Sequence, residues 1–475
     1  MSIDSLLSMY RAEETVCAPA TSGGGAIAVI RVSGPQSLTI TEKIFFPFAS
    51  GIRITEQKGY RIIYGEIRYE GKTIDNVLLS IFRSPHSYTG EDSCEISCHA
   101  SSWIQQKILE ALIKNGALAA SPGEFTQRAF LNGKLDLSQA EAVADLVASE
   151  SEAAHRIAIS QLKGAFSDKI KSLRKELLHF TSLIELELDF GEEDVEFADR
   201  KQLTEIVTRV LSMAHDLASS FSLGNAVKNG IPVVIAGSPN TGKSTLLNYL
   251  LNEEKAIVSE IPGTTRDAIE DVVIIDGIQF RFVDTAGIRV TDDIIENLGI
   301  NRTREKIGNA FLVLPVIDIN EGSSKANDIL ESIRLQPENI NKKLIILANK
   351  TDIATKDNIE EIRKNINIFP GDSLIFISAK TGEGLDKLKT VLIESVAGPE
   401  INTESIIITN IRHYEALLQV MESLTRVEEG LNNNLQEDLI ALDIRQAIHY
   451  LGEITGEITT DEILDSIFSN FCIGK

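Results

Sequence analysis

Short runs of apolar residues, separated by polar positions, mark the first quarter of the chain. Runs at residues 26–32, 61–69 and 77–82 are bounded by Gly, Pro and Ser, which is typical of strands. The segments between them have no single period. This mixed pattern predicts an N-terminal α/β domain over residues 1–120.

The hydrophobic period becomes helical near residue 121. From there to about residue 225 the chain is rich in Ala, Leu, Glu and Ser and nearly free of Pro and Gly. Ser138 and Glu141 predict a capping box at the start of one helix. The acidic run at 189–196 is interpreted as a solvated helix end or loop. One buried helix face is predicted from spacings of three and four between Leu137, Ala140, Val143, Ala144 and Val147.

Buried-strand runs alternate with amphipathic segments between residues 229 and 398. The runs lie at 232–236, 280–283, 311–317, 344–347 and 374–377. This alternation predicts a mainly parallel sheet with helices on both faces. Helix-like sequence returns over residues 399–475. The fold class is therefore multidomain, with an α/β domain inserted between two parts, 121–228 and 399–475, of an all-α domain.

Composition narrows the class of protein. The 475 residues are 43% hydrophobic and 24% charged, which predicts several folded domains. Four scattered cysteines argue against a disulfide framework. No apolar run reaches membrane-spanning length, and the N-terminus lacks the pattern of a signal peptide. We expect a cytoplasmic protein that does not bind membranes.

The charge of the chain disfavours direct binding to nucleic acid. Lys and Arg number 46 and Asp and Glu 69, which gives a formal charge of −23. Such a surface repels phosphate backbones. A chain of this charge that acts on nucleic acid needs a local basic patch, or a partner that carries the positive charge.

A phosphate-binding loop follows the strand at 233–236. Residues 237–244 read GSPNTGKS and lead into a helical run that begins at Thr245. Glycines let backbone N–H groups face the phosphates, and the helix N-terminus adds its dipole. Lys243 supplies positive charge and Ser244 a magnesium ligand. The predicted nucleotide contacts here are Asn240, Thr241, Gly242, Lys243, Ser244 and Thr245.

Four further motifs follow in the order typical of GTPases. A loop at 263–265 offers a threonine hydroxyl to magnesium, and the motif at 284–287 offers a carboxylate and a glycine amide. The motif at 349–352 reads NKTD, and its Asp352 can accept two hydrogen bonds from guanine. Adenine lacks that pair of donors. The motif at 378–380 completes the base pocket. The residues concerned are Gly263, Thr264, Thr265, Asp284, Thr285, Ala286, Gly287, Asn349, Lys350, Asp352, Ser378, Ala379 and Lys380.

The residue that orients the attacking water is not evident from these motifs. Ras-like GTPases commonly carry a glutamine directly after the Asp-Thr-Ala-Gly motif. Ile288 stands there, and an apolar side chain cannot orient water. Carboxylates at 291–296 are candidates for this task. An exposed acidic loop without a catalytic role is an equally weighted interpretation.

Taken together, these motifs resemble the MnmE (TrmE) family of tRNA modification GTPases. The resemblance also covers residues 87–92, the segment PGEFTQRAFLNGKLD at 122–136 and the terminal FCIGK at 471–475. It spans essentially the whole chain. It implies an N-terminal domain for folate binding and homodimerisation, a helical domain, and a GTPase domain inserted into the helical one.

The resemblance implies further roles around the nucleotide. Asn240, with Ser259, Ile261 and Thr264, matches residues around a potassium ion that supplies positive charge near the phosphates. Thr265 matches the magnesium threonine. Glu296 matches the catalytic glutamate, with Arg289 a weaker candidate in the same loop. The loop around GTP or GDP comprises Ser259, Glu260, Ile261, Pro262, Gly263, Thr264 and Thr265.

A second site is implied in the N-terminal domain. Arg31, Glu95 and Lys134 match positions that contact 5-formyltetrahydrofolate or a related one-carbon tetrahydrofolate, and terminal Lys475 reaches the same place. A glutamate pairs with the N–H edge of a pterin, while Arg and Lys suit carboxylates. Without the resemblance, ordinary surface ions are the favoured interpretation. Cys472 is implied to be important, as nucleophile or positioning group.

The remaining cysteines are interpreted as structural. Cys94 and Cys98 lie four residues apart in a strand-like run, which places both on one face. A metal site is the alternative, and a hydrophobic core is favoured.

The implied function is potassium-dependent GTP hydrolysis in a complex that modifies tRNA. With the FAD-containing flavoprotein MnmG, the family builds a carboxymethylaminomethyl-type group at carbon 5 of the wobble uridine. The alternative is a regulatory GTPase that switches ribosomes or partner proteins. Given the charge of −23, we expect the chain alone to bind tRNA weakly.

Overall fold

The structure is a computed structural model of the chain, and it divides into two compact units. Unit 1 comprises Met1–Val147, Ala158–Ala218 and Ile411–Lys475, and unit 2 comprises Ala148–Ile157 and Ser219–Asn410. The domain boundaries predicted at residues 120, 228 and 398 stay predictions. Residues described are 13–21, 25–189, 200–253, 270–284, 307–308, 310–334, 342–396, 406–433, 435, 437–469, 471–472 and 474.

Unit 1 begins with a seven-stranded sheet of order β3-β4-β5-β6-β2-β1-β7, in which only the β1–β7 pair is parallel. The three strands predicted here are confirmed. β5 starts earlier than predicted because Glu70 and Gly71, both with positive φ, form a tight turn after β4. The strands are β1 Val16–Pro19, β2 Ile27–Ser33, β3 Phe45–Pro47, β4 Arg61–Tyr69, β5 Lys72–Phe82, β6 Ser93–His99 and β7 Leu118–Ala119.

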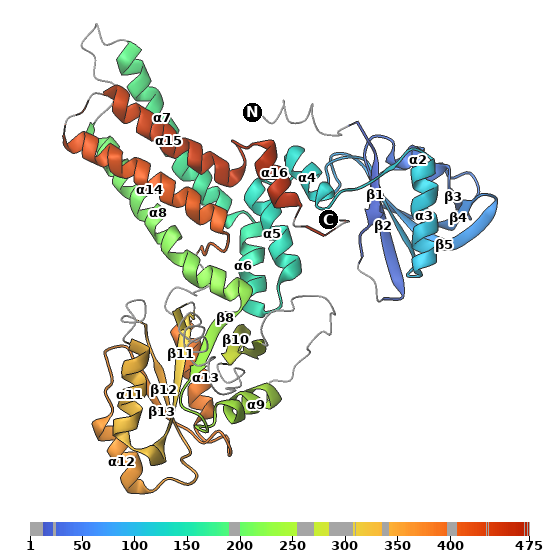
Figure 1. Cartoon of the computed structure of the whole chain (residues 1–475). Coiled ribbons are helices and arrows are strands. Elements are labelled where there is room, and N and C mark those ends of the chain that lie inside the picture. Colours follow the sequence, from blue (N-terminus) through green and yellow to red (C-terminus); the bar gives the residue numbers. More distant parts are fainter. Residues whose placement is uncertain are drawn as a thin grey trace, which may run out of the picture. The chain divides into compact units, whose positions relative to one another are not determined.

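Helices α2 (Ser37–Glu42) and α3 (Ser102–Lys114) contribute to the core on one face of this sheet (Figure 1). Cys94 and Cys98 belong to that core, as predicted. Burial raises the pKa of the Cys94 thiol to about 12 and that of Cys98 to about 11. Within the described ranges, no group of three or more His, Cys, Asp or Glu side chains is arranged to hold a metal.

The rest of unit 1 is helical, as predicted. Helix α14 packs on α15, and α15 packs on α7 (Figure 1). A smaller core joins Phe130 and Leu137 to Phe468 and Phe471 near the end of the chain. The helices outside the sheet domain, of which α5, α6 and α8 include residues of unit 2, are α4 Glu124–Leu131, α5 Leu137–Ala148, α6 Glu152–Leu162, α7 Ala165–Asp189, α8 Arg200–Asn229, α14 Ile411–Asn432, α15 Glu437–Thr455 and α16 Asp461–Phe468. Of the predicted acidic run at 189–196, residues 190–196 lie outside the described part.

The predicted capping box of α5 is wrong by two residues. Gln139 N–H donates to Asp136 Oδ1 over 3.0 Å, and Asp136 N–H donates to Gln139 Oε1 over 2.9 Å. This is the reciprocal pattern of a capping box with Asp136 as N-cap. Ser138 and Glu141 are instead buried inside the helix. Leu137 and Ala140 are buried as predicted, whereas Val147 is exposed.

Unit 2 holds a six-stranded sheet of order β13-β12-β11-β8-β10-β9. The five predicted strands are confirmed and pair in parallel. β9, antiparallel to β10, was not predicted. The sequence does signal this hairpin, through the two-residue turn Asp276–Gly277, whose φ angles are 49° and 75°. The strands are β8 Ile231–Ala236, β9 Glu270–Ile275, β10 Ile278–Asp284, β11 Leu312–Asp318, β12 Ile345–Asn349 and β13 Ser373–Phe376.

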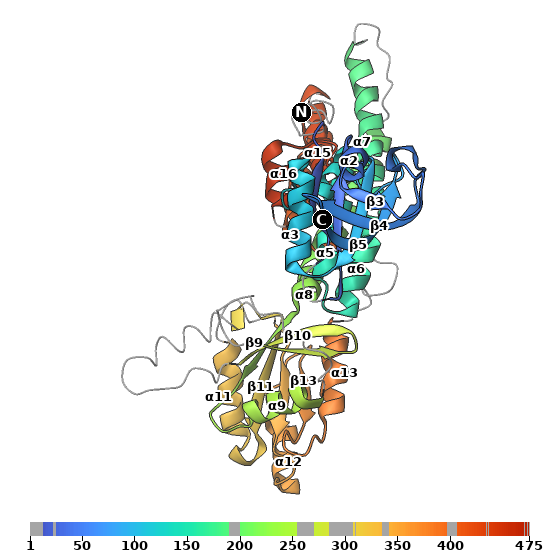
Figure 2. The ribbon, with the colours of Figure 1, turned by 90° about the vertical axis from the view of Figure 1, so that its right-hand side faces the viewer.

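Helices cover both faces of this sheet, as predicted for a parallel arrangement. α11 (Ser323–Arg334) and α12 (Lys356–Asn365) pack on one face. α9 (Lys243–Glu253) and α13 (Leu385–Val396) pack on the other, so α11 and α13 lie on opposite sides (Figure 2). Among the helices that the structure describes, none is both long and apolar enough to cross a membrane.

Candidate functional site

The phosphate-binding loop connects the central strand β8 to helix α9. Gly237 has φ 149°, and a Cβ there would lie 2.3 Å from the carbonyl oxygen of Val316. Gly242 has φ 98°, and a Cβ there would lie 2.3 Å from Asn349 Nδ2. Only glycine fits either position. Between them, exposed Asn240 also adopts a positive φ, of 64°.

Lys243 places its charge at the start of α9. The side chain is 8% exposed, and its Nζ donates to the carbonyl oxygens of Gly237 (2.9 Å) and Ser238 (2.8 Å). Ser244 and Thr245 follow on the exposed first turn of the helix. An ammonium group beside a helix N-terminus attracts anions. The arrangement therefore suits phosphate groups, with the Ser244 hydroxyl on the exposed side where a metal can reach it.

Asn349 ties this loop to the predicted base pocket. Its Nδ2 donates to the carbonyl oxygen of Thr241 over 2.7 Å, while its Oδ1 accepts from the N–H of Ala379 over 2.9 Å. The side chain is 2% exposed. These contacts join the ends of β8, β12 and β13. The predicted contact of Asn349 with the nucleotide stays a prediction; its observed contacts also position the phosphate-binding loop against the turn at Ala379.

The base-pocket residues lie at the ends of β12 and β13. Asp352 is exposed, and its Oδ1 accepts a hydrogen bond of 2.8 Å from the Ser378 hydroxyl. Lys350, with φ 73°, forms an ion pair of 2.7 Å with Asp318. Lys380 is exposed. An oriented, exposed carboxylate can accept hydrogen bonds from the N1 and amine donors of guanine.

The ion pair of Lys350 also affects Asp318 at the end of β11. Burial acts to raise the pKa of Asp318, but hydrogen bonds from Lys350 and Asn320 outweigh it and lower the pKa below its usual value. A charged Asp318 keeps Lys350 at the carboxyl edge of the sheet. This edge is where open α/β sheets bind ligands.

Several predicted residues are not placed by the structure. Asp284 ends β10 and pairs in register with Ile235 of β8, which puts its backbone at the same sheet edge. Predicted residues that lie outside the described ranges are Ser259, Glu260, Ile261, Pro262, Gly263, Thr264, Thr265, Thr285, Ala286, Gly287, Ile288, Arg289, the acidic candidates at 291–296 including Glu296, and Lys475.

The second predicted site is built on the N-terminal sheet. Arg31 on β2 and Glu95 on β6 are register partners, joined by Nε–Oε1 and Nη2–Oε1 distances of 3.0 and 2.9 Å. The rings of Tyr88 and Phe125 lie 5.1 and 5.4 Å from the guanidinium carbon. Sequence reasoning missed these two rings. Their segments, 87–92 and 122–136, were noted for the family resemblance only.

The end of the chain lies beside the same sheet. The carbonyl oxygen of Cys472, an exposed residue, accepts a hydrogen bond of 3.5 Å from the N–H of Gly123. Gly474 has φ 97°, and a Cβ there would lie 1.8 Å from the carbonyl oxygen of Pro19. Pro19 follows Ala18, the register partner of Arg31.

The fourth residue predicted for this site, Lys134, donates a hydrogen bond to the carbonyl oxygen of Pro85 over 3.1 Å.

Two protein families match this chain over most of its length. Residues 15–134 match the family described as "GTP-binding protein TrmE N-terminus", and residues 137–472 match "MnmE helical domain". The chain belongs to the MnmE/TrmE family. Both candidate sites lie within MnmE/TrmE sequence, since the two matches include Arg31, Glu95 and the phosphate-binding loop.

Individual MnmE relatives match along the whole chain. The Bacteroides thetaiotaomicron protein is 51% identical over 98% of this chain and 100% of its own length. The Bacteroides fragilis protein is 52% identical over the same shares. The Flavobacterium psychrophilum protein is 51% identical over 97% of this chain and 99% of its own length. Each is described as "tRNA modification GTPase MnmE".

Proposed function

We propose that this chain is a GTPase that acts in tRNA modification. One observation supports the GTPase activity most directly. Asn349 bridges the loop of Lys243 and the turn of Ala379, and so links the proposed phosphate site to the proposed guanine pocket. Identity of about 51% over 98% of the chain to MnmE proteins supports the tRNA part.

The nucleotide is GTP, hydrolysed with the help of Mg²⁺. Lys243 neutralises phosphate charge, and Asp352 selects guanine. Ser244 offers an exposed hydroxyl at the helix N-terminus, which suits magnesium because this ion prefers oxygen ligands and phosphates. Thr265 and Asp284 complete the magnesium shell in this proposal. Magnesium supplies charge neutralisation when bound.

Asn240 would help to hold a potassium ion, which would supply the positive charge that an arginine finger supplies in other GTPases. Asn240 supports this because it is an exposed residue at a positive-φ position in the phosphate-binding loop, and its side-chain oxygen is a suitable cation ligand. Ser259, Ile261 and Thr264 contribute further oxygens, and Glu296 orients the attacking water, with Arg289 in the same loop. Ile288 has no polar group for that task.

Potassium dependence is tested by GTP hydrolysis at matched ionic strength. We expect at least about tenfold faster turnover in potassium than in sodium chloride, because a positive charge at the phosphates stabilises the transition state. GDP affinity, measured in both salts, serves as the control and should change little. Equal turnover in the two salts would contradict the role of Asn240.

The second site binds a one-carbon tetrahydrofolate such as 5-formyltetrahydrofolate. Glu95 pairs with donors on the pterin edge, and the cationic groups of Arg31, Lys134 and Lys475 bind acidic groups of the folate. The Tyr88 and Phe125 rings support this assignment, since they offer flat apolar surface beside Arg31. Cys472 acts there as nucleophile or positioning group. A purely regulatory GTPase would have no use for this site.

The chain works as a homodimer that also binds a flavoprotein, MnmG, which carries FAD. The sheet face opposite α2 and α3 supports the homodimer, because Ile62, Tyr64 and Leu78 are 68%, 55% and 46% exposed on it. Arg31 and Glu95 lie on the same face by strand alternation. The complex installs a carboxymethylaminomethyl-type group at carbon 5 of the tRNA wobble uridine.

A further inference from the structure

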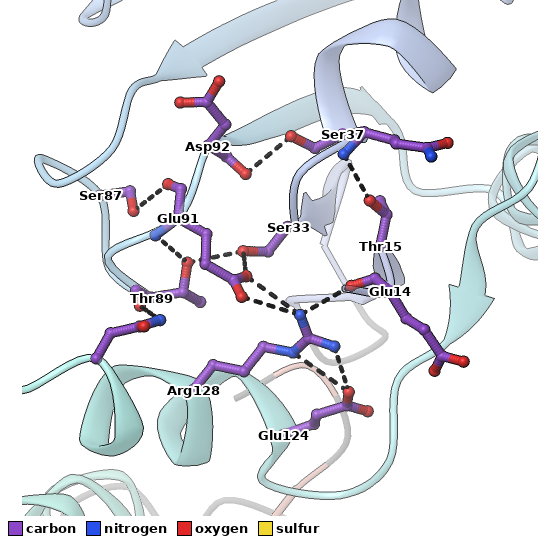
Figure 3. A network of polar contacts seen from close by, with 12 residues as sticks. Glu14, Thr15, Ser33, Ser37, Ser87, Thr89, Glu91, Asp92, Glu124 and Arg128 are labelled. Carbon is purple, nitrogen blue, oxygen red and sulfur yellow. Dashed lines mark hydrogen bonds and ion pairs between the residues drawn. The ribbon is translucent and has the colours of Figure 1, made fainter. Parts of the chain in front are cut away.

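A buried arginine joins helix α4 to the loop that carries Tyr88. Arg128 is 6% exposed. Its Nη1 donates to Glu91 Oε1 and to the carbonyl oxygen of Glu14, both over 3.0 Å, and its Nη2 donates to Glu124 Oε1 over 2.8 Å (Figure 3). One guanidinium therefore connects three segments of unit 1: α4, the loop at 87–92 and the chain at Glu14.

The carboxylate of Glu91 extends this network into the sheet. It accepts a hydrogen bond of 2.8 Å from the Ser33 hydroxyl, which lies 2.7 Å from the Thr89 hydroxyl (Figure 3). Asn132, just after α4, donates to the carbonyl oxygen of Thr89 over 2.8 Å. The loop at 87–92 is thus held from β2 on one side and from α4 on the other.

Tyr88 lies in the middle of that loop. Its hydroxyl is 2.8 Å from the Thr126 hydroxyl of α4, and its ring faces the Arg31 guanidinium. Phe125, on the same turn of α4, faces Arg31 as well. Any shift of α4 against the loop changes the distance between these two rings. Arg31 then loses the packing that directs it toward Glu95.

We propose that Arg128 is a positioning residue for the Arg31–Glu95 site. It acts by fixing α4 against the loop at 87–92, so that Tyr88 and Phe125 hold the Arg31 guanidinium in place. The expected effect of Arg128 on ligand binding rests on the proposed folate function of this site. Lysine cannot replace Arg128, because one ammonium cannot reproduce a planar fork of donors to two carboxylates and a carbonyl.

The test measures two properties of full-length Arg128→Lys. Binding of 5-formyltetrahydrofolate, followed by calorimetry, should weaken by roughly tenfold. Amide hydrogen exchange should accelerate in residues 84–92. GTP turnover should stay unchanged. Arg53→Lys is the matched control, since Arg53 pairs with Glu56 on the exposed surface of the same unit, and should change neither property.

A double-mutant cycle with Tyr88→Leu separates positioning from general destabilisation. If Arg128 acts through the Tyr88 loop, Arg128→Lys should cost little further affinity once the Tyr88 ring is gone. Additive losses would overturn the proposal. If Arg128→Lys does not fold, Glu91→Gln replaces it in the cycle, because it weakens the ion pair by which Arg128 holds the loop.

The exchange measurement distinguishes this inference from the folate proposal. If the wild-type chain binds no folate, the proposed ligand is wrong. Faster amide exchange at 84–92 in Arg128→Lys would still support the positioning role. Unchanged exchange in that segment would overturn the role of Arg128, whatever the wild-type folate affinity.

Discussion

At the scale of single residues, the nucleotide site is made of close contacts between motifs that are far apart in sequence. The motifs themselves could be predicted, because each is a short contiguous segment with its own chemistry. The role of Asn349 could not. Its amide reaches Thr241 across 108 positions, and no local pattern encodes that contact. The same holds for Arg31 and Glu95, which are 64 positions apart.

Asp352→Asn tests the guanine pocket. An amide cannot accept from both guanine donors as a carboxylate does, and each hydrogen bond to a charged group contributes about 1.5–3 kcal/mol. We expect GTP affinity to fall by about a hundredfold or more. Xanthosine triphosphate should then bind better than GTP, because the amide N–H that the substitution introduces meets a carbonyl where guanine has an amine.

The control for this pocket is Asp357→Asn. Asp357 is an exposed acidic residue in the first turn of α12, two residues after Thr355, the N-cap of that helix. Affinities for both nucleotides are measured by competition with a fluorescent guanine nucleotide. Retention of wild-type GTP preference in Asp352→Asn would show that this carboxylate does not read the base.

At the scale of elements, periodicity predicted α5 but not what its polar side chains do. Glu141 is buried and accepts hydrogen bonds from Arg412, over 3.0 and 2.8 Å, at the start of α14. His413 Nε2 lies 2.7 Å from Glu141 Oε2. These partners are 271 and 272 positions away along the chain. A buried glutamate at helical spacing looks like a capping residue when the distant partner is unknown.

The titration of this cluster follows from its burial. Burial acts to raise the pKa of Glu141, but Arg412 and His413 outweigh it and hold the pKa at about 2. Burial lowers the pKa of His413, with Glu141 opposing that effect. His413 is then neutral near pH 7. As a neutral ring it donates its Nε2–H to Glu141, and its buried Nδ1 has no hydrogen-bond partner among the described residues.

Glu141→Gln tests the contribution of this cluster to stability. The substitution leaves Arg412 without a carboxylate partner at this position, so we expect a loss of about 3 kcal/mol at pH 7. Urea unfolding followed by circular dichroism measures it. Glu422→Gln, on an exposed pair with Arg426, is the control and should change stability by less than about 0.5 kcal/mol.

The pH dependence gives a second check. The folded pKa of Glu141, about 2, lies below its ordinary value of 4.5. Its contribution is therefore complete above pH 4.5 and disappears as the pH falls toward 2. Wild type should lose its advantage over Glu141→Gln across that interval. A difference in stability that is independent of pH would contradict an ionised Glu141.

At the scale of the whole molecule, the order of helical, α/β and helical segments could be predicted from changes in hydrophobic period. The edge strand β9 could not be predicted from the parallel pattern alone, because it pairs antiparallel with β10; its signal in the sequence is the Asp276–Gly277 turn between them. The net charge of −23 remains compatible with action on tRNA if the proposed flavoprotein partner holds most of the RNA. Composition constrains the mode of binding rather than the substrate.

The central claim, a GTPase that acts in tRNA modification, is tested most directly by mass spectrometry of tRNA nucleosides. Cells that lack this chain are compared with cells that express the wild type or Cys472→Ser. We predict loss of the carboxymethylaminomethyl-type wobble uridine in the deletion, recovery with wild type, and no recovery with Cys472→Ser, although purified Cys472→Ser still hydrolyses GTP. Unchanged wobble uridines in the deletion strain would contradict the account.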